Sequence, residues 1–176
     1  MIADAAPELF YISHEAFVAD VAILAQQIED DAWKPDFIIG VGRGGLVPAV
    51  HISHRTNLPM LSIDHSSKVL GFADELLAKV AAESATGVRL LFIDDINDSG
   101  RTIDYIRGLL ADNGCERDNL RFGVLINNSR SQVVVDYWSQ MIDRDSDKRW
   151  FVFPWEAMGE KFTIVEEALS VPERLA

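Results

Sequence analysis

The stretch LLFIDDINDSGRT, residues 90–102, has the order of a buried strand, a polar turn and the start of a helix. Residues 90–93 are all apolar, which is typical of a strand covered on both faces. Asp94 and Asp95 stand where this strand is expected to end, and the short polar loop 98–102 follows. Apolar residues then recur at helical spacing, so the stretch predicts a strand–loop–helix unit.

A polar turn between a strand and a helix is suited to binding an anion. The free N–H groups of the first helical turn point outward, and the helix dipole favours negative charge there. Ser99 and Thr102 add hydroxyl donors, and Gly100 lets a ligand approach the backbone. Asp94 and Asp95 would accept hydrogen bonds from a sugar diol or hold Mg²⁺. A phosphorylated ribose satisfies both demands; the alternative is a solvated strand end with Ser99 as an ordinary helix cap.

A second strand–loop–helix unit precedes the first. Residues 37–41 form an apolar strand, and the glycine-rich segment GRGG at 42–45 follows it. Pro48 is then expected in the first turn of a helix, where its missing N–H costs nothing. Such a loop can hold a phosphate in backbone N–H groups, with Arg43 adding a charged fork. The alternative is a tight turn that carries a solvated arginine.

Strands alternate with helices along the remaining chain, which predicts an α/β fold with a mostly parallel central sheet flanked by helices. We expect one domain over residues 1–176. Segment 65–87 is expected to contain a crossover helix, whose polar entry can be flexible. The other expected elements are a helix from Ser13 to about Asp31, strands at 60–64, 121–126 and 133–137, an exposed charged segment at 143–149, and a weak helix after 157.

Composition narrows the possible partners. The chain has 176 residues and a formal charge of −12, with 16 Lys and Arg against 28 Asp and Glu, which disfavours nucleic acid and acidic lipid. The single cysteine, Cys115, excludes an internal disulfide and a cysteine metal cluster. No apolar run approaches about 18 residues. We therefore expect a cytoplasmic protein that binds neither membranes nor nucleic acid.

Three segments resemble those of a known family. FIDDINDSGRT, residues 92–102, resembles the phosphoribosyl diphosphate (PRPP) motif of type I phosphoribosyltransferases. VGRGGLVPA, residues 41–49, is similar to the pyrophosphate loop of the purine-specific members. WFVFPWE, residues 150–156, is similar to the W-x-x-x-P-W-D/E ending of xanthine–guanine and archaeal hypoxanthine enzymes. The resemblance spans about residues 13–156. It implies the fold with a small hood formed by terminal segments, and a homodimer or higher homo-oligomer. It also implies a mobile loop within 65–87 that closes over the active site, as the alternative to an ordinary crossover helix.

The resemblance implies Mg²⁺-dependent transfer of a 5-phosphoribosyl group from PRPP to a 6-oxopurine, with release of pyrophosphate. Asp98 would accept the proton from purine N7, and Arg43 would stabilise the leaving pyrophosphate. Asp94 and Asp95 would hold Mg²⁺ and the ribose hydroxyls. The full set implied to bind PRPP is Arg43, Gly44, Asp94, Asp95, Asp98, Ser99, Gly100, Arg101 and Thr102. A non-proline cis peptide bond is also implied between Gly42 and Arg43.

The base would lie in a C-terminal hood of about residues 127–160. There the resemblance implies that Trp150 stacks on the purine and that groups near Phe151 read its edge. Related enzymes place a lysine, a donor to the purine O6, where this chain has Asn127 and Asn128. An amide donates a hydrogen bond without charge. Two alternatives therefore stay open: a PRPP- or nucleotide-sensing regulator on the same fold, and transfer to another acceptor such as a pyrimidine.

Overall fold

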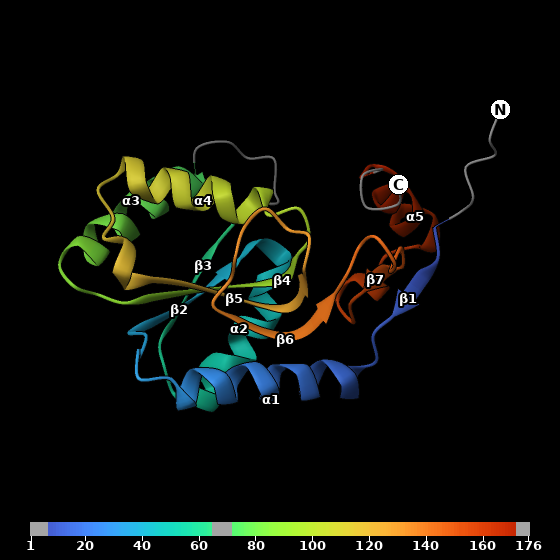
Figure 1. The fold of residues 1–176 in the computed structure, drawn as a ribbon, viewed down its shortest axis with the longest axis horizontal. Helices are drawn as coiled ribbons and strands as arrows, with labels where there is room; N and C mark the ends of the chain where they lie inside the picture. The colour runs from blue at the N-terminus through green and yellow to red at the C-terminus, as the bar shows by residue number, and fades with distance from the viewer. Residues whose placement is uncertain (1–6, 65–71, 172–176) are drawn as a thin grey trace.

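The computed structural model describes residues 7–64 and 72–171, and its centre is a five-stranded parallel sheet (Figure 1). In spatial order the strands are β3 (Met60–Ile63), β2 (Phe37–Val41), β4 (Leu90–Asn97), β5 (Leu120–Asn128) and β6 (Tyr137–Ile142). Because every pairing in this sheet is parallel, the carboxyl ends of all five strands meet at one edge. The prediction of an α/β fold with a mostly parallel sheet is confirmed.

Two helices cover each face of the sheet (Figure 1). On one face α1 (His14–Asp30) and α2 (Gly42–Thr56) pack on a core that includes Leu91 and Ile93. On the other face α3 (Phe72–Ala85) and α4 (Arg101–Asp112) pack on Leu90 and Phe92. Successive strand side chains point to opposite faces, so a strand between two helical layers must be apolar throughout. This alternation explains why residues 90–93 form an unbroken apolar run.

The first helix follows the sequence pattern. Ser13 caps α1, and its Oγ accepts a hydrogen bond of 3.1 Å from the N–H of Ala16. Phe17, Leu24 and Ile28 lie on one stripe of the helix and are fully buried in the core. The predicted helix from Ser13 to about Asp31 is therefore confirmed to within a residue at each end.

A small hood stands beside the sheet (Figure 1). Strand β1 (Leu9–Tyr11) pairs in parallel with β7 (Trp150–Val152), which joins residues from the two ends of the chain. Helix α5 (Lys161–Leu169) follows β7. Two short 3₁₀ turns, Arg117–Asn119 and Glu156–Met158, complete the elements of the described chain. The terminal segments thus form the hood that the fold prediction included.

Strand β4 is longer than its apolar run predicted. Pairing with β5 continues past the acidic pair, with Ile96 opposite Ile126 and Asn97 opposite Asn127. Asp94 and Asp95 therefore lie within the second half of the strand rather than after its end. The backbone ladder, which the side-chain pattern does not reveal, decides where the strand ends.

The predicted strand at 133–137 is wrong, because the strand of this region is β6 at Tyr137–Ile142. Val133 and Val135 pack into the core while Val134 is 80% exposed, so the alternation typical of a strand is present. Residues 133–136 take part in no strand pairing within the described part of the chain. Instead the N–H of Asp136 donates to the Phe122 carbonyl at 2.8 Å.

The crossover region 65–87 contains helix α3 over Phe72–Ala85, as one of its two interpretations required. The remainder of the possible mobile loop, residues 65–71, lies outside the described residues. The expected strand at 60–64 is confirmed as β3, which ends at Ile63. Helix α4 ends at Asp112 with Asn113 as its C-cap, and Gly114 follows with φ of 78°.

Candidate active site

The glycine-rich segment lies directly against the acidic strand. A Cβ atom added to Gly44 would lie 2.2 Å from Oδ2 of Asp95, and one added to Gly45 would lie 2.0 Å from the Ile93 carbonyl oxygen. Real Cβ atoms do not approach other atoms so closely, so only glycine lets the first turn of α2 rest on β4. The two motifs that are about 50 residues apart in the sequence therefore share one edge of the sheet.

The segment GRGG is the first turn of α2 rather than a loop before it, since the helix begins at Gly42. Pro48 consequently lies inside the helix and not in its first turn, which corrects the sequence prediction. The described chain contains no cis peptide bond, so the one implied between Gly42 and Arg43 is wrong. Gly42 instead turns the chain with φ of 56°. Arg43 is exposed at the start of this helix.

The predicted phosphate loop encloses a small cavity before α4. Residues 96–103 line this loop cavity, whose volume is about 30 Å³. Gly100 is the N-cap of α4 with φ of 87°, and no side chain caps this end of the helix in the described structure. Ser99 is therefore not an ordinary helix cap, although its Oγ accepts a long contact of 3.5 Å from the N–H of Arg101. A helix that starts on a glycine without a side-chain cap directs its first-turn N–H groups toward the site where an anion would lie.

Gly100 is fixed by its neighbours as well as by its backbone angle. A Cβ atom here would lie 2.8 Å from Cγ2 of Val133 and 2.9 Å from Oγ of Ser131. The segment after β5 therefore presses on the outside of the loop. Any larger residue at position 100 would displace that segment or the loop.

Asp98 is held in a buried ion pair with Arg144. Nε of Arg144 lies 3.1 and 3.2 Å from the two carboxylate oxygens of Asp98, and Nη2 lies 2.9 Å from Oδ2. Nη1 of Arg144 donates to the carbonyl oxygens of Asp147 and Arg149. The Arg144 guanidinium also lies over the ring of Phe151, 5.2 Å from its centre. The prediction that 143–149 is exposed is therefore wrong at Arg144, which is buried.

Three asparagines form a buried network next to this ion pair. Nδ2 of Asn97 donates to Oδ1 of Asn127 at 2.8 Å and to the Val133 carbonyl at 2.8 Å. Nδ2 of Asn128 donates to the Asp98 carbonyl at 3.0 Å, and its Oδ1 accepts from the backbone N–H groups of Arg130 and Arg144. Both amides that were predicted to read the base are thus engaged with the protein. Their contacts brace the phosphate loop and position Arg144.

A second cavity, of about 170 Å³, lies beside Trp150. We name it the aromatic cavity; its lining residues are Asp95, Ile96, Arg144, Trp150, Phe151, Phe153 and Glu156. Glu156 is fixed in this wall, where its Oε2 accepts a 2.9 Å hydrogen bond from the N–H of Phe153. Asp95 belongs to the same cavity, so the acidic strand and the hood face each other here.

The aromatic cavity and the loop cavity are neighbours. Ile96 lines both cavities. The Arg144–Asp98 ion pair lies at their boundary, because Arg144 lines the aromatic cavity and Asp98 lines the loop cavity. The structure therefore brings together the acidic pair, the phosphate loop, the start of α2 and Trp150. Asn127 and Asn128 are absent from the lining of both cavities.

Arg144 is a site residue that no sequence pattern indicates. It stands in the run DRDSDKR at 143–149, in which every residue but one is charged, and such runs are usually solvated. Nothing in its spacing marks it, since its partner Asp98 is 46 positions away. Only the parallel order of β4, β5 and β6 places the end of β6 beside the phosphate loop.

The donor set suits Mg²⁺ only together with a substrate. No group of three or more His, Cys, Asp or Glu side chains that could hold a metal occurs in residues 7–64 and 72–171. Asp94 and Asp95 supply carboxylate oxygens, the ligand type that Mg²⁺ prefers. Mg²⁺ is commonly bound by one or two carboxylates plus substrate phosphates and water, so the acidic pair fits the implied ion.

The chain matches the model of the phosphoribosyl transferase domain over residues 11–158. It belongs to this family. A curated relative, the xanthine-guanine phosphoribosyltransferase of Cereibacter sphaeroides, is 25% identical over 158 residues, covering 84% of this chain and 86% of the relative. The predictions of family membership and of an enzyme of this class are confirmed.

Solved structures share the fold. The purine phosphoribosyltransferase of Pyrococcus horikoshii superposes with a TM-score of 0.63 at 25% identity, covering 85% of this chain and 94% of that chain. A hypothetical protein from Neisseria gonorrhoeae with bound ppGpp has a TM-score of 0.67 at 17% identity, covering 95% and 97%. Among the described residues, no helix is long and apolar enough to cross a membrane.

Proposed function

We propose that the protein transfers a 5-phosphoribosyl group from PRPP to a 6-oxopurine, namely hypoxanthine, guanine or xanthine. The observation that carries this proposal is the shared edge of the two cavities. A phosphate seated in the loop cavity and a base in the aromatic cavity would place the ribose between them, beside Asp95. The relatives named above as purine enzymes support the choice of base.

In this proposal the N–H groups and hydroxyls of residues 98–102 hold the 5-phosphate. Asp94 and Asp95 orient the ribose hydroxyls and would hold Mg²⁺. That ion would supply neutralising charge to the departing pyrophosphate, next to the first turn of α2 and Arg43. Gly44 keeps this turn close to Asp95, so the leaving group and the ribose are bound by adjoining segments.

Arg144 supplies the charged donor that Asn127 and Asn128 lack. A guanidinium carries five N–H donors. The contacts with Asp98, Asp147 and Arg149 engage Nε, both N–H groups of Nη1 and one of Nη2, which makes four. The fifth, on Nη2, has no acceptor among the described residues, and Arg144 lines the aromatic cavity. We assign this N–H to the purine O6, above the stacking face of Trp150.

Asp98 keeps its proposed role as acceptor of the purine N7 proton. Its carboxylate is paired with Arg144, so a proton arriving there would weaken that pairing. The position of Arg144 then links proton transfer at Asp98 to recognition of the base. Discrimination against adenine follows, because a 6-amino group is itself a donor and would face another donor.

A substrate panel tests the proposed reaction. The protein is incubated with PRPP, Mg²⁺ and one of hypoxanthine, guanine, xanthine, adenine, uracil or orotate, and products are resolved by chromatography. We expect the 6-oxopurines alone to give nucleoside monophosphates with equimolar pyrophosphate. Turnover of a pyrimidine in preference to purines, or of no base at all, would contradict the proposal.

The acidic pair is tested in the same assay. Replacing Asp94→Asn together with Asp95→Asn should lower kcat/KM by about 10²-fold or more, since both groups act where charge develops. Asp112→Asn, at the exposed end of α4, removes the same kind of charge outside the site and should leave kcat/KM unchanged. Near-normal turnover of the double variant would remove Asp94 and Asp95 from the mechanism.

A further inference from the structure

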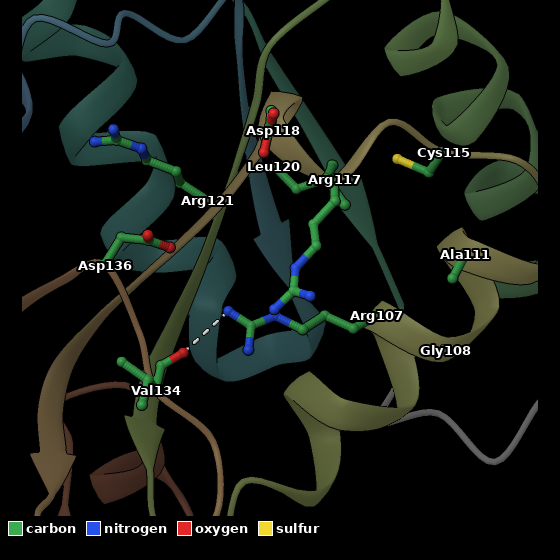
Figure 2. A pocket seen from close by; sticks show the side chains of 10 residues that line it. All are labelled: Arg107, Gly108, Ala111, Cys115, Arg117, Asp118, Leu120, Arg121, Val134 and Asp136. Carbon is green, nitrogen blue, oxygen red and sulfur yellow. Dashed lines mark hydrogen bonds between the residues drawn. The ribbon is translucent and has the colours of Figure 1, made fainter.

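A large pocket opens at the other end of the sheet, where β5 begins (Figure 2). Its volume is about 630 Å³. We name it the arginine pocket; its lining residues are Arg107, Gly108, Ala111, Cys115, Arg117, Asp118, Leu120, Arg121, Val134 and Asp136. Helix α4, the turn before β5, the start of β5 and the segment after β5 supply these residues. None of them lines the loop cavity or the aromatic cavity.

Two of the three arginines direct their guanidinium groups into the same space (Figure 2). Arg107 is half-buried, donates from Nη2 to the Val134 carbonyl at 3.0 Å, and lies 4.7 Å from the ring centre of Phe122. Burial is the main cause that lowers the pKa of Arg107; the charge of Arg117 adds to this lowering, while Asp136 and Asp104 oppose it. The exposed Arg117 guanidinium has no hydrogen-bond or ion-pair partner among the described residues. Two like charges that face each other favour an anion between them.

The other charged groups of the pocket are largely engaged elsewhere. Arg121 is paired with Asp31 and with the hydroxyl of Tyr137. Oδ2 of Asp136 accepts a 2.8 Å hydrogen bond from the N–H of Phe122, so this carboxylate is anchored at the sheet while it offsets part of the Arg107 charge. The exposed Asp118 also lines the pocket, so three arginines stand there against two carboxylates. Arg117, beside Arg107, is the arginine without a hydrogen-bond or ion-pair partner among the described residues. This is an uncommon arrangement in a chain of net charge −12.

The remaining walls suit the organic part of a ligand. Ala111, Leu120 and Val134 give apolar surface, and a Cβ atom added to Gly108 would meet nothing within 4 Å, so the helix is open there. The volume falls within the roughly 300–1,000 Å³ typical of small-molecule sites and far exceeds that of a single phosphate. Arginine is well matched to phosphate because its planar fork can donate two parallel hydrogen bonds.

We propose that the arginine pocket is a second ligand site, separate from the active site, that binds a phosphorylated organic anion of the nucleotide class. The phosphate lies between Arg107 and Arg117, and the organic part rests on α4 and Val134. This inference stands on the pocket alone and does not depend on which base the active site accepts.

The single cysteine gives a local reporter for this site. Cys115 lines the pocket, its exposure is intermediate, and burial raises the pKa of its thiol. The experiment measures the alkylation rate of Cys115 by iodoacetamide, a neutral reagent, using intact-protein mass spectrometry at mildly alkaline pH. The probes are ADP, inorganic pyrophosphate and sodium chloride at matched ionic strength. We expect saturable protection by ADP, weaker protection by pyrophosphate, and none by chloride.

Arg117→Ala is the decisive variant, because the residue is exposed and its loss should not disturb folding. Loss of one charge-assisted contact should raise the half-protecting ADP concentration about 10- to 100-fold. Arg107→Gln should act in the same direction. Arg55→Ala is the matched control: it removes an exposed arginine from α2, on the opposite face of the sheet, and should leave protection unchanged.

Several results would overturn the site. These are absence of protection by ADP, undiminished protection in Arg117→Ala, or equal loss of protection in Arg55→Ala, which would indicate a general charge effect. Pyrophosphate protecting as well as ADP would overturn the organic part of the ligand. Protection that rises with protein concentration alone would show a contact between copies of the chain instead.

Discussion

Two arginine–aspartate pairs of the same chemistry stand at opposite ends of the sheet. At the carboxyl end, Arg144 and Asp98 have side chains only 8% and 4% exposed. At the amino end, Arg121 and Asp31 are 26% and 29% exposed. The first pair lies between two cavities of the proposed active site, and the second lies at the edge of the arginine pocket.

The two settings place different demands on the pair. Removing charges from water costs several kcal/mol per ion, and the protein must then supply the missing hydrogen bonds. Arg144 accordingly donates to backbone carbonyls as well as to Asp98. The Arg121–Asp31 pair is partly exposed to water, and both side chains also form hydrogen bonds with the hydroxyl of Tyr137. Burial raises the pKa of Tyr137 to about 12. A buried ion pair is a poor stabiliser compared with apolar packing, so its presence at the carboxyl end favours a functional role.

The largest expected effect is the loss of one buried partner. Arg144→Met leaves the Asp98 carboxylate without its counter-charge and should lower the free energy of unfolding by about 3–5 kcal/mol. For a chain of this size that corresponds to a fall in Tm of roughly 6–20 °C. Arg121→Met, the matched change at the outer pair, should cost no more than about 1 kcal/mol. Urea unfolding of both variants checks the contrast, and equal losses would erase it.

A smaller and sharper effect is the coupling within each pair. Double-mutant cycles combine Arg144→Met with Asp98→Asn, and Arg121→Met with Asp31→Asn. The first double variant keeps neither buried charge, so it should recover much of the unfolding free energy that each single variant loses. The coupling energy between Arg144 and Asp98 should therefore lie in the upper part of the usual range of about 0.5–3 kcal/mol. The outer pair should show coupling below about 1 kcal/mol. Additive losses at Arg144 and Asp98 would mean that they do not act as a pair.

The smallest expected effect is a pH dependence at the outer pair. The backbone N–H of Trp33 is the largest cause that holds the pKa of Asp31 below its ordinary value of 3.8, and Arg121 and Tyr137 add to it while burial opposes it. A lowered folded-state pKa stabilises the protein above the unfolded value and loses that contribution as the pH falls through the folded value. Asp31→Asn should thus lower Tm slightly at pH 7. The difference should shrink below pH 3.8, and a Tm difference that grows with acidity would contradict this sign.

The local chemistry of the carboxyl edge could be predicted because it lies in contiguous residues. A strand, a polar loop and a helix start follow one another in LLFIDDINDSGRT, and each is specified by its own neighbours. The apolar run predicts burial on both faces, and Gly100 predicts close backbone approach. The same holds for the glycine-rich segment, although its Gly42 belongs to the helix and not to a preceding loop.

The errors arose where local pattern and long-range pairing differ. Residues 133–136 alternate like a strand, yet they pair with no strand of the described chain, and the Val134 carbonyl accepts a hydrogen bond from Arg107 of α4 instead. Asn127 and Asn128 looked available at a strand end, but β4 continues beside them and their amides are used inside the protein. Whether a polar side chain is buried depends on the segments that pack against it in space. Its neighbours in the sequence do not reveal which segments these are.

The sequence by itself therefore determined the α/β class, the two phosphate-type motifs and the family. The tertiary structure alone decided that Arg144, which lies in a charged run, pairs with Asp98, 46 positions away in the sequence. It also decided that Arg107 and Arg117 line one pocket at the amino end of the sheet, away from the proposed active site. The physical reason is that apolar periodicity and turn chemistry are local properties of the chain. The pairing of charges depends on distance in space, which is fixed only when the strands have taken their order.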